Sequence, residues 1–213
     1  MHYTTCRHYN LHMSHISVLT GDLVASSRLS SHALDAALGA VQKACGDLSP
    51  AIGATRFARN RGDGWQIALD APRFQARLAL LIRADLRALG PELSTRIAIA
   101  QGAGSLPDTA DLNAAHGPVF TASGQLLDTL EGPRITYAGG GALGAALRLF
   151  DHISQGWTQA QARAMVPMLR LDPPTQTAAS AEIGITRQSL AQALHGAGYE
   201  AILEALQMIE KRA

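Results

Sequence analysis

The order of apolar segments in the first half of the chain is the feature that most restricts its fold. Between residues 15 and 104, the periodicity predicts strand, helix, strand, strand, helix and strand in that order. Gly62-Asp63-Gly64 separates the second and third strands and is a strong hairpin-turn signal. This order is that of a split βαβ unit, an antiparallel sheet covered by helices on one face. We therefore predict an α+β, ferredoxin-like domain.

Apolar spacing and turn residues set the limits of these elements. Each predicted strand is a short strand-like run followed within two residues by glycine or aspartate, and the runs cover residues 15–20, 55–61, 64–69, 95–100 and 134–138. The predicted helices have apolar residues three or four apart, and they run from Ser30 or Ser31 to about Gly46, from Pro72 to Leu89, from 117 to 130 and from 142 to 153. The domain is predicted to cover residues 15–154.

The two ends of the chain differ from this domain in composition. Residues 1–14 have no periodicity, and we expect them to be a disordered tail that an upstream start codon adds before a second candidate start at Met13. The alternative, a weak metal-binding tail with His2, His8 and His12, is not supported by any recognised ligand spacing. A change of composition near Gln155-Gly156 begins a helical stretch, in which Thr158 caps a helix and Asp172-Pro173-Pro174 breaks it. We therefore predict a small all-α domain over residues 155–213.

Charge and composition exclude several classes of protein. The 213 residues include 18 basic and 17 acidic side chains, so the whole chain lacks the basic character of many nucleic-acid-binding proteins. A content of 47% hydrophobic residues excludes disorder for most of the chain. Two cysteines in different settings do not form a disulfide framework, and no uncharged apolar run is long enough to cross a bilayer. The simplest expectation is a cytoplasmic protein.

Two aspartates stand where the predicted sheet would bring them together. Asp22 follows the first strand, Asp63 is at the hairpin turn, and these two strands are neighbours in a split βαβ sheet. Adjacent carboxylates repel each other unless a cation lies between them, and Mg²⁺ shared with nucleotide phosphates would fill that role. The alternative is that Asp22 caps a turn and Asp63 is an ordinary hairpin residue. The paired interpretation predicts a metal site with Mg²⁺ as its cofactor.

Four short motifs, taken in order, resemble a known family. They are Gly21-Asp22-Leu23 followed by Ser26, Arg59-x-x-Gly62-Asp63-Gly64, the segment from Arg96 to Gly102 and the segment from Gly117 to Gly124. Together they resemble the SatD family of bacterial proteins and, more distantly, the catalytic domain of class III nucleotidyl cyclases. The resemblance covers about residues 15–150 and, with the helical tail, nearly the whole chain. It implies a cyclase-like domain followed by a helix-turn-helix.

The resemblance to the cyclases also implies roles for individual residues. It implies that Asp22 and Asp63 bind the metal ion and that Gly21 and Leu23 lie beside the triphosphate. Arg59 falls where cyclases often carry a lysine that reads the base. These residues are the predicted metal and nucleotide contacts on the first three strands.

The resemblance is incomplete on the helix over residues 117–130. Cyclases present an asparagine to the ribose there and, four residues later, an arginine to the transition state, and the matching positions are Thr121 and Gln125. Glutamine cannot supply the fixed positive charge that neutralises charge developing on phosphorus. Cyclisation is therefore not expected, whereas Thr121 stays a predicted nucleotide contact.

Residues 176–195 have the spacing of a helix-turn-helix. Its apolar positions are occupied by Ala179, Ile183, Ile185, Leu190 and Ala193. Ser180 is the small residue at the helix crossing, Gly184 permits the turn, and Thr186 is the N-cap of the second helix. The predicted DNA-binding residues at the start of that helix are Thr186, Arg187, Gln188, Ser189 and Gln192. The alternative is a plain helical hairpin used for dimerisation.

The charge of the C-terminal part limits its affinity for DNA. Five basic and five acidic side chains follow Gln155, so one copy gains little attraction to phosphates. A dimer would double the contacts, and the apolar face of residues 199–209 would either form the dimer interface or pack on the module's own core. We therefore expect a homodimer.

Three functions are compatible with these features. The first, which we prefer, is a DNA-binding regulator whose cyclase-like domain senses a nucleotide or a metal ion, or serves as a scaffold. The second is a Mg²⁺-dependent enzyme that acts on nucleotide phosphates through Asp22 and Asp63. The third is a non-enzymatic interaction protein.

Overall fold

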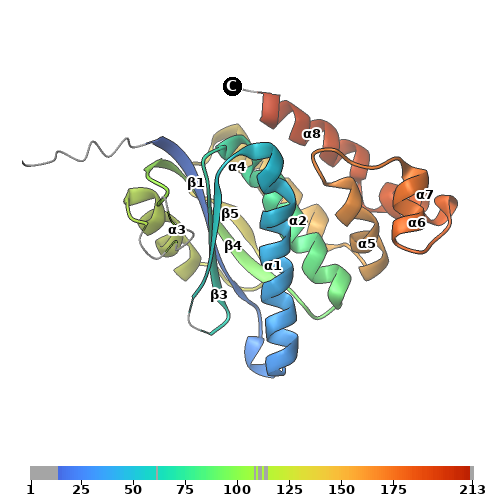
Figure 1. Ribbon diagram of the computed structural model, residues 1–213, viewed down its shortest axis with the longest axis horizontal. Helices are drawn as coiled ribbons and strands as arrows, with labels where there is room; N and C mark the ends of the chain where they lie inside the picture. The colour runs from blue at the N-terminus through green and yellow to red at the C-terminus, as the bar shows by residue number, and fades with distance from the viewer. Residues whose placement is uncertain (1–13, 61, 108, 110–111, 113–114, 212–213) are drawn as a thin grey trace, which may run out of the picture.

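A five-stranded sheet with helices on both faces forms the larger part of the protein (Figure 1). The computed structural model describes residues 14–60, 62–107, 109, 112 and 115–211. The strands are β1 (Ser14–Leu23), β2 (Thr55–Arg59), β3 (Gly64–Leu69), β4 (Thr95–Gly104) and β5 (Ile135–Tyr137). The helices of this part are α1 (Ser31–Ile52), α2 (Gln75–Leu89), α3 (Pro118–Asp128) and α4 (Gly141–Gln155), with short 3₁₀ turns η1 (Ser26–Arg28) and η2 (Pro72–Phe74). The predicted tail lies outside the described residues except for Ser14, which begins β1.

The sheet has the strand order β2-β3-β1-β4-β5. The first four strands are antiparallel to their neighbours and follow the order of the split βαβ unit, so the predicted ferredoxin-like α+β fold is confirmed. The prediction of an antiparallel sheet is wrong at one edge, where β5 pairs in parallel with β4. The reason is that α3 carries the chain from the end of β4 back to the start of β5, and such a crossover makes two strands parallel.

Helices cover both faces of the sheet, whereas the sequence predicted helices on one face. Successive residues of a strand point to opposite faces. Leu19 and Ile97 face a large core under α1, α2 and α4, while Val18, Ala100 and Val119 belong to a smaller core under α3. Figure 1 shows α3 on the opposite side of the sheet from α1 and α2. The prediction of helices on one face failed because β1 has apolar side chains on both faces. Both faces must therefore be shielded from water by helices.

The first helix is longer than predicted. The sequence placed its end near Gly46, but α1 continues to Ile52 with Pro50 in its last turn. Leu48 and Ile52 are both buried and extend the apolar face of the helix by two further positions. Packing of these side chains therefore outweighs the cost of a proline close to the helix end.

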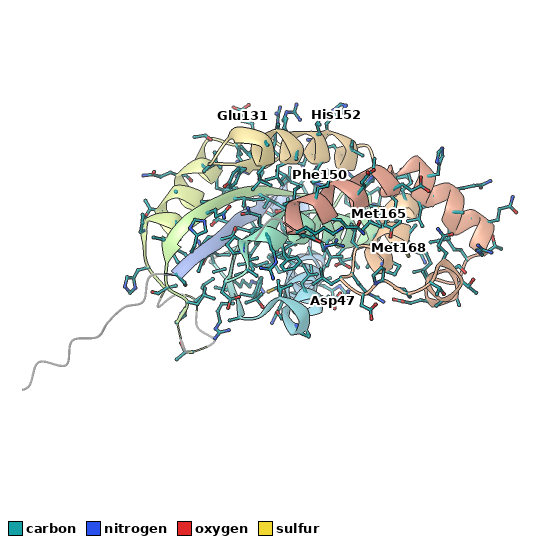
Figure 2. All side chains as sticks on the ribbon, turned by 90° about the horizontal axis from the view of Figure 1, so that it is seen from above. Asp47, Glu131, Phe150, His152, Met165 and Met168 are labelled. Carbon is teal, nitrogen blue, oxygen red and sulfur yellow. The ribbon has the colours of Figure 1, made fainter. Side chains whose placement is uncertain are left out.

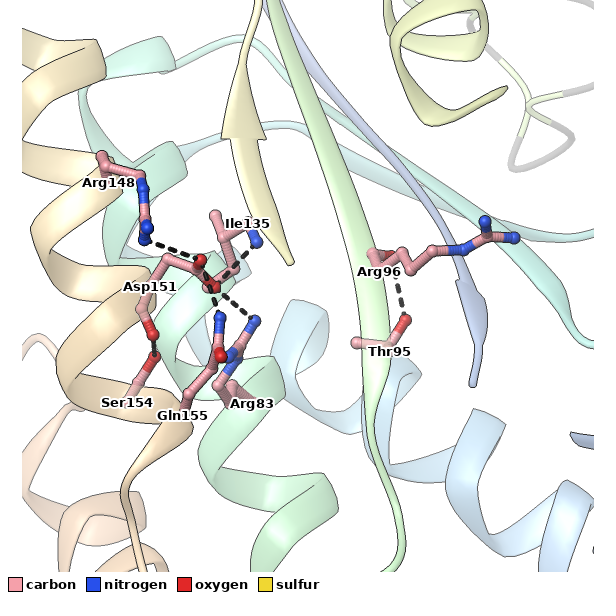
Figure 3. Close-up of polar contacts among 8 residues, drawn as sticks. All are labelled: Arg83, Thr95, Arg96, Ile135, Arg148, Asp151, Ser154 and Gln155. Carbon is pink, nitrogen blue, oxygen red and sulfur yellow. Dashed lines mark hydrogen bonds and ion pairs between the residues drawn. The ribbon is translucent and has the colours of Figure 1, made fainter. Parts of the chain in front are cut away.

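A buried aspartate joins three elements beneath the sheet (Figure 3). The Asp151 side chain on α4 is fully buried, and its Oδ1 accepts hydrogen bonds from Arg83 of α2 and from the backbone N–H of Ile135 in β5, both at 3.0 Å. Its Oδ2 accepts from Gln155 at 2.8 Å and lies 3.4 Å from Arg148. Burial lowers the pKa of Arg83, although the neighbouring carboxylate partly offsets this effect. Both oxygens of the Asp151 carboxylate thus have hydrogen-bond partners, and two arginines balance its negative charge.

The helices after α4 extend the same core. They are α5 (Gln159–Met168), α6 (Gln176–Glu182), α7 (Arg187–Gly196) and α8 (Tyr199–Lys211). Thr158 caps α5 as predicted, accepting a hydrogen bond from the backbone N–H of Gln161 at 3.2 Å. Helix α5 lies along α2. Met165 and Met168 of α5 belong to the large core (Figure 2). Apolar packing therefore continues across residue 155, and a division into two domains there stays a prediction.

A buried ion pair also ties the last helix to the sheet domain. Arg77 of α2 is 3% exposed and donates from Nε to Oε1 of Glu210 on α8 at 2.6 Å and from its NH2 group to Oε2 at 2.8 Å. The apolar face of α8, formed by Tyr199, Ile202 and Leu206, is buried in the chain's own core. Within the described part of the chain, no helix has the length and apolar character needed to span a membrane.

Candidate functional site

The two predicted metal ligands lie at the same end of the sheet. In the antiparallel pairing of β1 with β3, Asp22 is opposite Gly64, which directly follows Asp63 in the hairpin turn. Asp22 is also opposite Arg96 in the pairing of β1 with β4. The end of β1 therefore lies between an acidic hairpin and a basic neighbouring strand.

Arg96 forms an ion pair with the carboxylate of Asp22. Its Nε donates to Oδ1 at 2.7 Å and its NH2 group donates to Oδ2, a bidentate pair reaching from β4 to β1. The third nitrogen donates to the carbonyl oxygen of Leu130 at 2.5 Å. The hydrogen bond to Asp22 raises the pKa of Arg96, and the charges of Asp22, Asp63 and Asp128 add to this effect. The Arg96 guanidinium thus pairs with Asp22, and the charges of Asp63 and Asp128 also act on it.

This arrangement does not fit a metal ion at Asp22 as it stands. Both carboxylate oxygens already accept strong, charge-assisted hydrogen bonds from Arg96. Among the described residues, no group of three or more histidine, cysteine, aspartate or glutamate side chains is placed to hold a metal ion. The chain itself supplies a cation to the Asp22 carboxylate. Binding of Mg²⁺ there would require Arg96 to leave Asp22, and the metal site stays a prediction.

Gly21 lies where the packing leaves no space for a side chain. A Cβ atom at this position would come within 2.3 Å of the Trp65 ring and 2.4 Å of the carbonyl oxygen of Arg96. The buried Trp65 indole donates to Thr95 Oγ1 at 3.1 Å, and Thr95 Oγ1 donates to the carbonyl oxygen of Asp22 at 2.5 Å. The side chain of Leu23 is 4% exposed and packs in the large core. Gly21 and Leu23 therefore have structural roles that hold the end of β1 in place.

The other two predicted nucleotide contacts, Arg59 and Thr121, lie on β2 and α3. Arg59 at the end of β2 donates to Oδ1 of Asp35 on α1 at 2.7 Å, in an exposed ion pair. Thr121 is exposed on α3. Ser123, two residues after Thr121, is buried against the sheet, and its hydroxyl lies 2.8 Å from that of Thr20 on β1. The nucleotide-binding role of Arg59 and Thr121 stays a prediction.

A second candidate surface is formed by α6 and α7. Thr175 caps α6, and Thr186 caps α7 as predicted, accepting from the backbone N–H of Ser189 at 3.1 Å. Gly184 has a φ of +72° in the turn between the two helices, a conformation that favours glycine. Ala179 and Leu190 are fully buried at the contact of the two helices with the core. The two helices are therefore held firmly in a defined relative orientation.

The start of α7 carries a row of exposed polar side chains. Thr186, Arg187, Gln188, Ser189 and Gln192 are all exposed, whereas Leu190 between them points inward. On the neighbouring α5, Arg163 is also exposed and donates to the carbonyl oxygen of Ile183 at 3.4 Å. The Arg170 guanidinium is paired with Glu182 instead. All five predicted DNA-binding residues thus share one accessible helix end.

Comparison with known proteins found similar structures but no matching family. No protein-family model matched the chain, and no curated protein sequence did. The guanylate cyclase domain of RhGC from Catenaria anguillulae in complex with GTP is similar at 19% identity, over 59% of this chain and 78% of that chain, with a TM-score of 0.45. The guanylyl cyclase Cya2 is similar at 18% identity, over 60% of this chain and 79% of that chain, with a TM-score of 0.44. The adenylyl cyclase CyaB from P. aeruginosa is similar at 13% identity, over 58% of this chain and 76% of that chain, with a TM-score of 0.45.

These three structures are nucleotidyl cyclases, and the similarity concerns the arrangement of helices and strands. At such low identities and TM-scores, it assigns no activity to this chain. The resemblance to the SatD family likewise stays a prediction.

Sequence reasoning missed the most important residue of the first site. Arg96 begins one of the four sequence motifs, but the motif alone does not predict an ion pair with Asp22. The signal was available in principle, because β1 and β4 are neighbours in a split βαβ sheet and both residues stand near a strand end. Only the register of the two strands shows that they are directly opposite.

Proposed function

We propose that the protein is a DNA-binding regulator that contacts DNA with α7. The observation that carries this proposal is the accessible, capped start of α7, where Arg187, Gln188, Ser189 and Gln192 are exposed together. Arginine and glutamine side chains pair with guanine and adenine edges in the major groove, and serine suits a phosphate or a base. A helix N-terminus also attracts phosphate through its free backbone N–H groups.

The sheet domain acts in this proposal as a scaffold. The pairing of Arg96 with Asp22 supports that role, because it neutralises the end of β1 without a bound ion. The order of the sequence motifs supports membership of the SatD family. We also propose a homodimer, since a module with balanced charge needs more than one copy to gain enough phosphate contacts.

The test is selection of DNA by the full-length protein. Random short duplexes are enriched on the immobilised protein, and binding of the enriched sequence is followed by fluorescence anisotropy. We expect Arg187→Ala to weaken binding by about 1–3 kcal/mol, as for loss of one bidentate base contact. Arg28→Ala, which removes an exposed arginine before α1, is the matched control and should bind like the wild type. Failure to enrich any sequence, or equal binding by Arg187→Ala, would contradict the proposal.

The enzyme alternative is tested on the same preparation. A panel of nucleoside triphosphates is incubated with the protein and Mg²⁺, and phosphate or pyrophosphate release is measured. We expect no turnover, because Asp22 is held by Arg96. Turnover that disappears in Asp63→Asn would instead support an enzyme that uses both aspartates.

A further inference from the structure

A large pocket lies at the opposite end of β1 from Asp22. Its volume is about 890 Å³, within the range of small-molecule sites in proteins. Its polar lining includes His15 of β1, Gln101 of β4 and Arg73 of η2. Because seven positions of an extended strand separate His15 from Asp22, the pocket is roughly 23 Å from the aspartate site. It is a separate feature of the molecule.

The walls of the pocket are apolar and come from two helices. They are formed by Ala142, Leu143 and Ala146 of α4 and by Ala205, Met208 and Ile209 of α8. These helices contact each other and run side by side (Figure 2). Met208 is 61% exposed, a large apolar side chain left open at the pocket edge. An aliphatic group would bury surface on both walls at once.

A chain of hydrogen bonds fixes which polar groups of the pocket lining donate and which accept. Gln101 Oε1 accepts from Gln75 Nε2 at 3.1 Å and from the hydroxyl of Tyr137 at 3.0 Å. The Gln101 side-chain nitrogen must then be the donor to Nε2 of His15, at 2.8 Å. A histidine that accepts at Nε2 carries its proton on Nδ1. His15 is thus held as a hydrogen-bond donor at its other ring nitrogen.

Arg73 brings a positive charge to the pocket lining. The Arg73 guanidinium lies 4.8 Å from the centre of the Phe74 ring, and Arg73 is an exposed residue. No acidic side chain is among the described residues that line the pocket. The lining thus combines one cation and a histidine N–H donor with two apolar walls, a combination complementary to a carboxylate with a hydrocarbon chain.

We propose that this pocket binds an aliphatic carboxylate, with its carboxylate at Arg73 and His15 and its hydrocarbon chain between α4 and α8. The buried pair of Arg77 with Glu210 keeps the α8 wall in place. Since α8 also packs on α7, the bound acid would touch the neighbour of the proposed DNA-reading helix, and this last point alone rests on the proposed function.

The experiment is calorimetric titration of the full chain, without DNA, with octanoate and decanoate below their micelle-forming concentrations and with decanol below its solubility limit. We expect decanoate to bind more tightly than octanoate, by about fourfold for each added CH₂ group. Decanol, which has the same chain without the charge, should bind at least about tenfold more weakly than decanoate. Absence of decanoate binding, or equal binding of decanol, would overturn the proposal.

Three variants locate the site. Arg73→Gln should weaken decanoate binding by about tenfold and leave decanol unchanged, whereas the control Arg28→Gln should change neither. Ala146→Phe should fill the space between the walls and abolish binding of both ligands. Met208→Glu alters an exposed position, and it should weaken decanoate binding through charge repulsion more than it weakens decanol binding. Wild-type affinity for decanoate in Arg73→Gln and Met208→Glu would overturn the assignment, whatever the outcome with DNA.

Discussion

Arg96 holds Asp22 across two neighbouring strands, with one hydrogen bond from Nε at 2.7 Å and a second from its NH2 group to the other carboxylate oxygen. The pair is partly exposed, at 31% for the arginine side chain and 22% for the aspartate. It places a fixed cation at Asp22, where a dissociable ion would otherwise be needed. The charge of the Asp22 carboxylate is therefore neutralised within the chain.

This pairing predicts how the protein responds to Mg²⁺. In the wild type, the backbone amide signals of Gly21, Asp22 and Leu23 should not move on addition of Mg²⁺, as followed by ¹H–¹⁵N NMR. In Arg96→Ala, the unpaired carboxylates of Asp22 and Asp63 should bind the ion and shift these signals. Arg59→Ala, which breaks the separate pair with Asp35, is the control and should behave as the wild type. Movement of the wild-type signals would mean that Arg96 yields to the metal ion.

A methyl group at Gly21 should disturb the same strand end. Gly21→Ala places Cβ within 2.3 Å of the Trp65 ring, so we expect a loss of about 3 kcal/mol in the free energy of unfolding in urea. Gly46→Ala is the matched control, because Gly46 lies inside α1 with no atom within 4 Å of the added Cβ. It should stabilise the protein by up to about 1 kcal/mol. Equal stability of the two variants would contradict the close packing of Trp65.

Removal of Asp151 should be among the most damaging single changes. Asp151→Ala leaves Arg83 buried without its charged partner, and we expect a loss of about 3–5 kcal/mol in unfolding free energy. Arg148 also approaches Asp151 but is 59% exposed, so Arg148→Ala should cost about 0.5 kcal/mol or less. A similar small effect for both variants, measured by urea unfolding, would refute the central role of Asp151.

Asp85 should make stability depend on pH. Its Oδ2 is buried and has no hydrogen-bond partner among the described residues, and burial raises its pKa from 3.8 to about 6, although Lys43 opposes this. The folded state therefore binds a proton more tightly than the unfolded state, so this group favours folding at low pH and loses that contribution as pH rises through about 6.

The corresponding variant is Asp85→Asn, which imitates the protonated form. Relative to the wild type, we expect it to gain on the order of 2 kcal/mol of unfolding free energy at about pH 8 and almost nothing at about pH 4. Asp35→Asn, at an exposed aspartate, serves as the control for removal of a charge. A pH-independent difference between Asp85→Asn and the wild type would show that Asp85 titrates normally.

Local signals in the sequence were sufficient for the order of elements. Hydrophobic periodicity located the four strands of the split βαβ unit, and threonine caps located the starts of α5 and α7, because these features depend only on neighbouring residues. They failed at Gly46, the predicted end of the first helix, because contacts of Leu48 and Ile52 with the core prolong α1. A local rule for glycine cannot include the energy of distant packing.

The candidate sites depended on longer-range information. The pairing of Asp22 with Arg96 is set by the register between β1 and β4, which are separated by more than seventy positions in the chain. The pocket between α4 and α8 depends on how the last helix docks, and no single segment predicts that. The exposed residues of α7, in contrast, follow from the spacing within one helix, and they were placed on the accessible side from the sequence alone.

The pair of Arg77 with Glu210 has a consequence for how the chain is made. The two residues are 133 positions apart, so Arg77 leaves the ribosome long before its partner has been synthesised. Until then, the guanidinium that the finished protein buries has no carboxylate to meet, and burying it would be costly. We expect α2 to settle into its final environment only when α8 emerges, so that this part of the core forms late in synthesis of the domain.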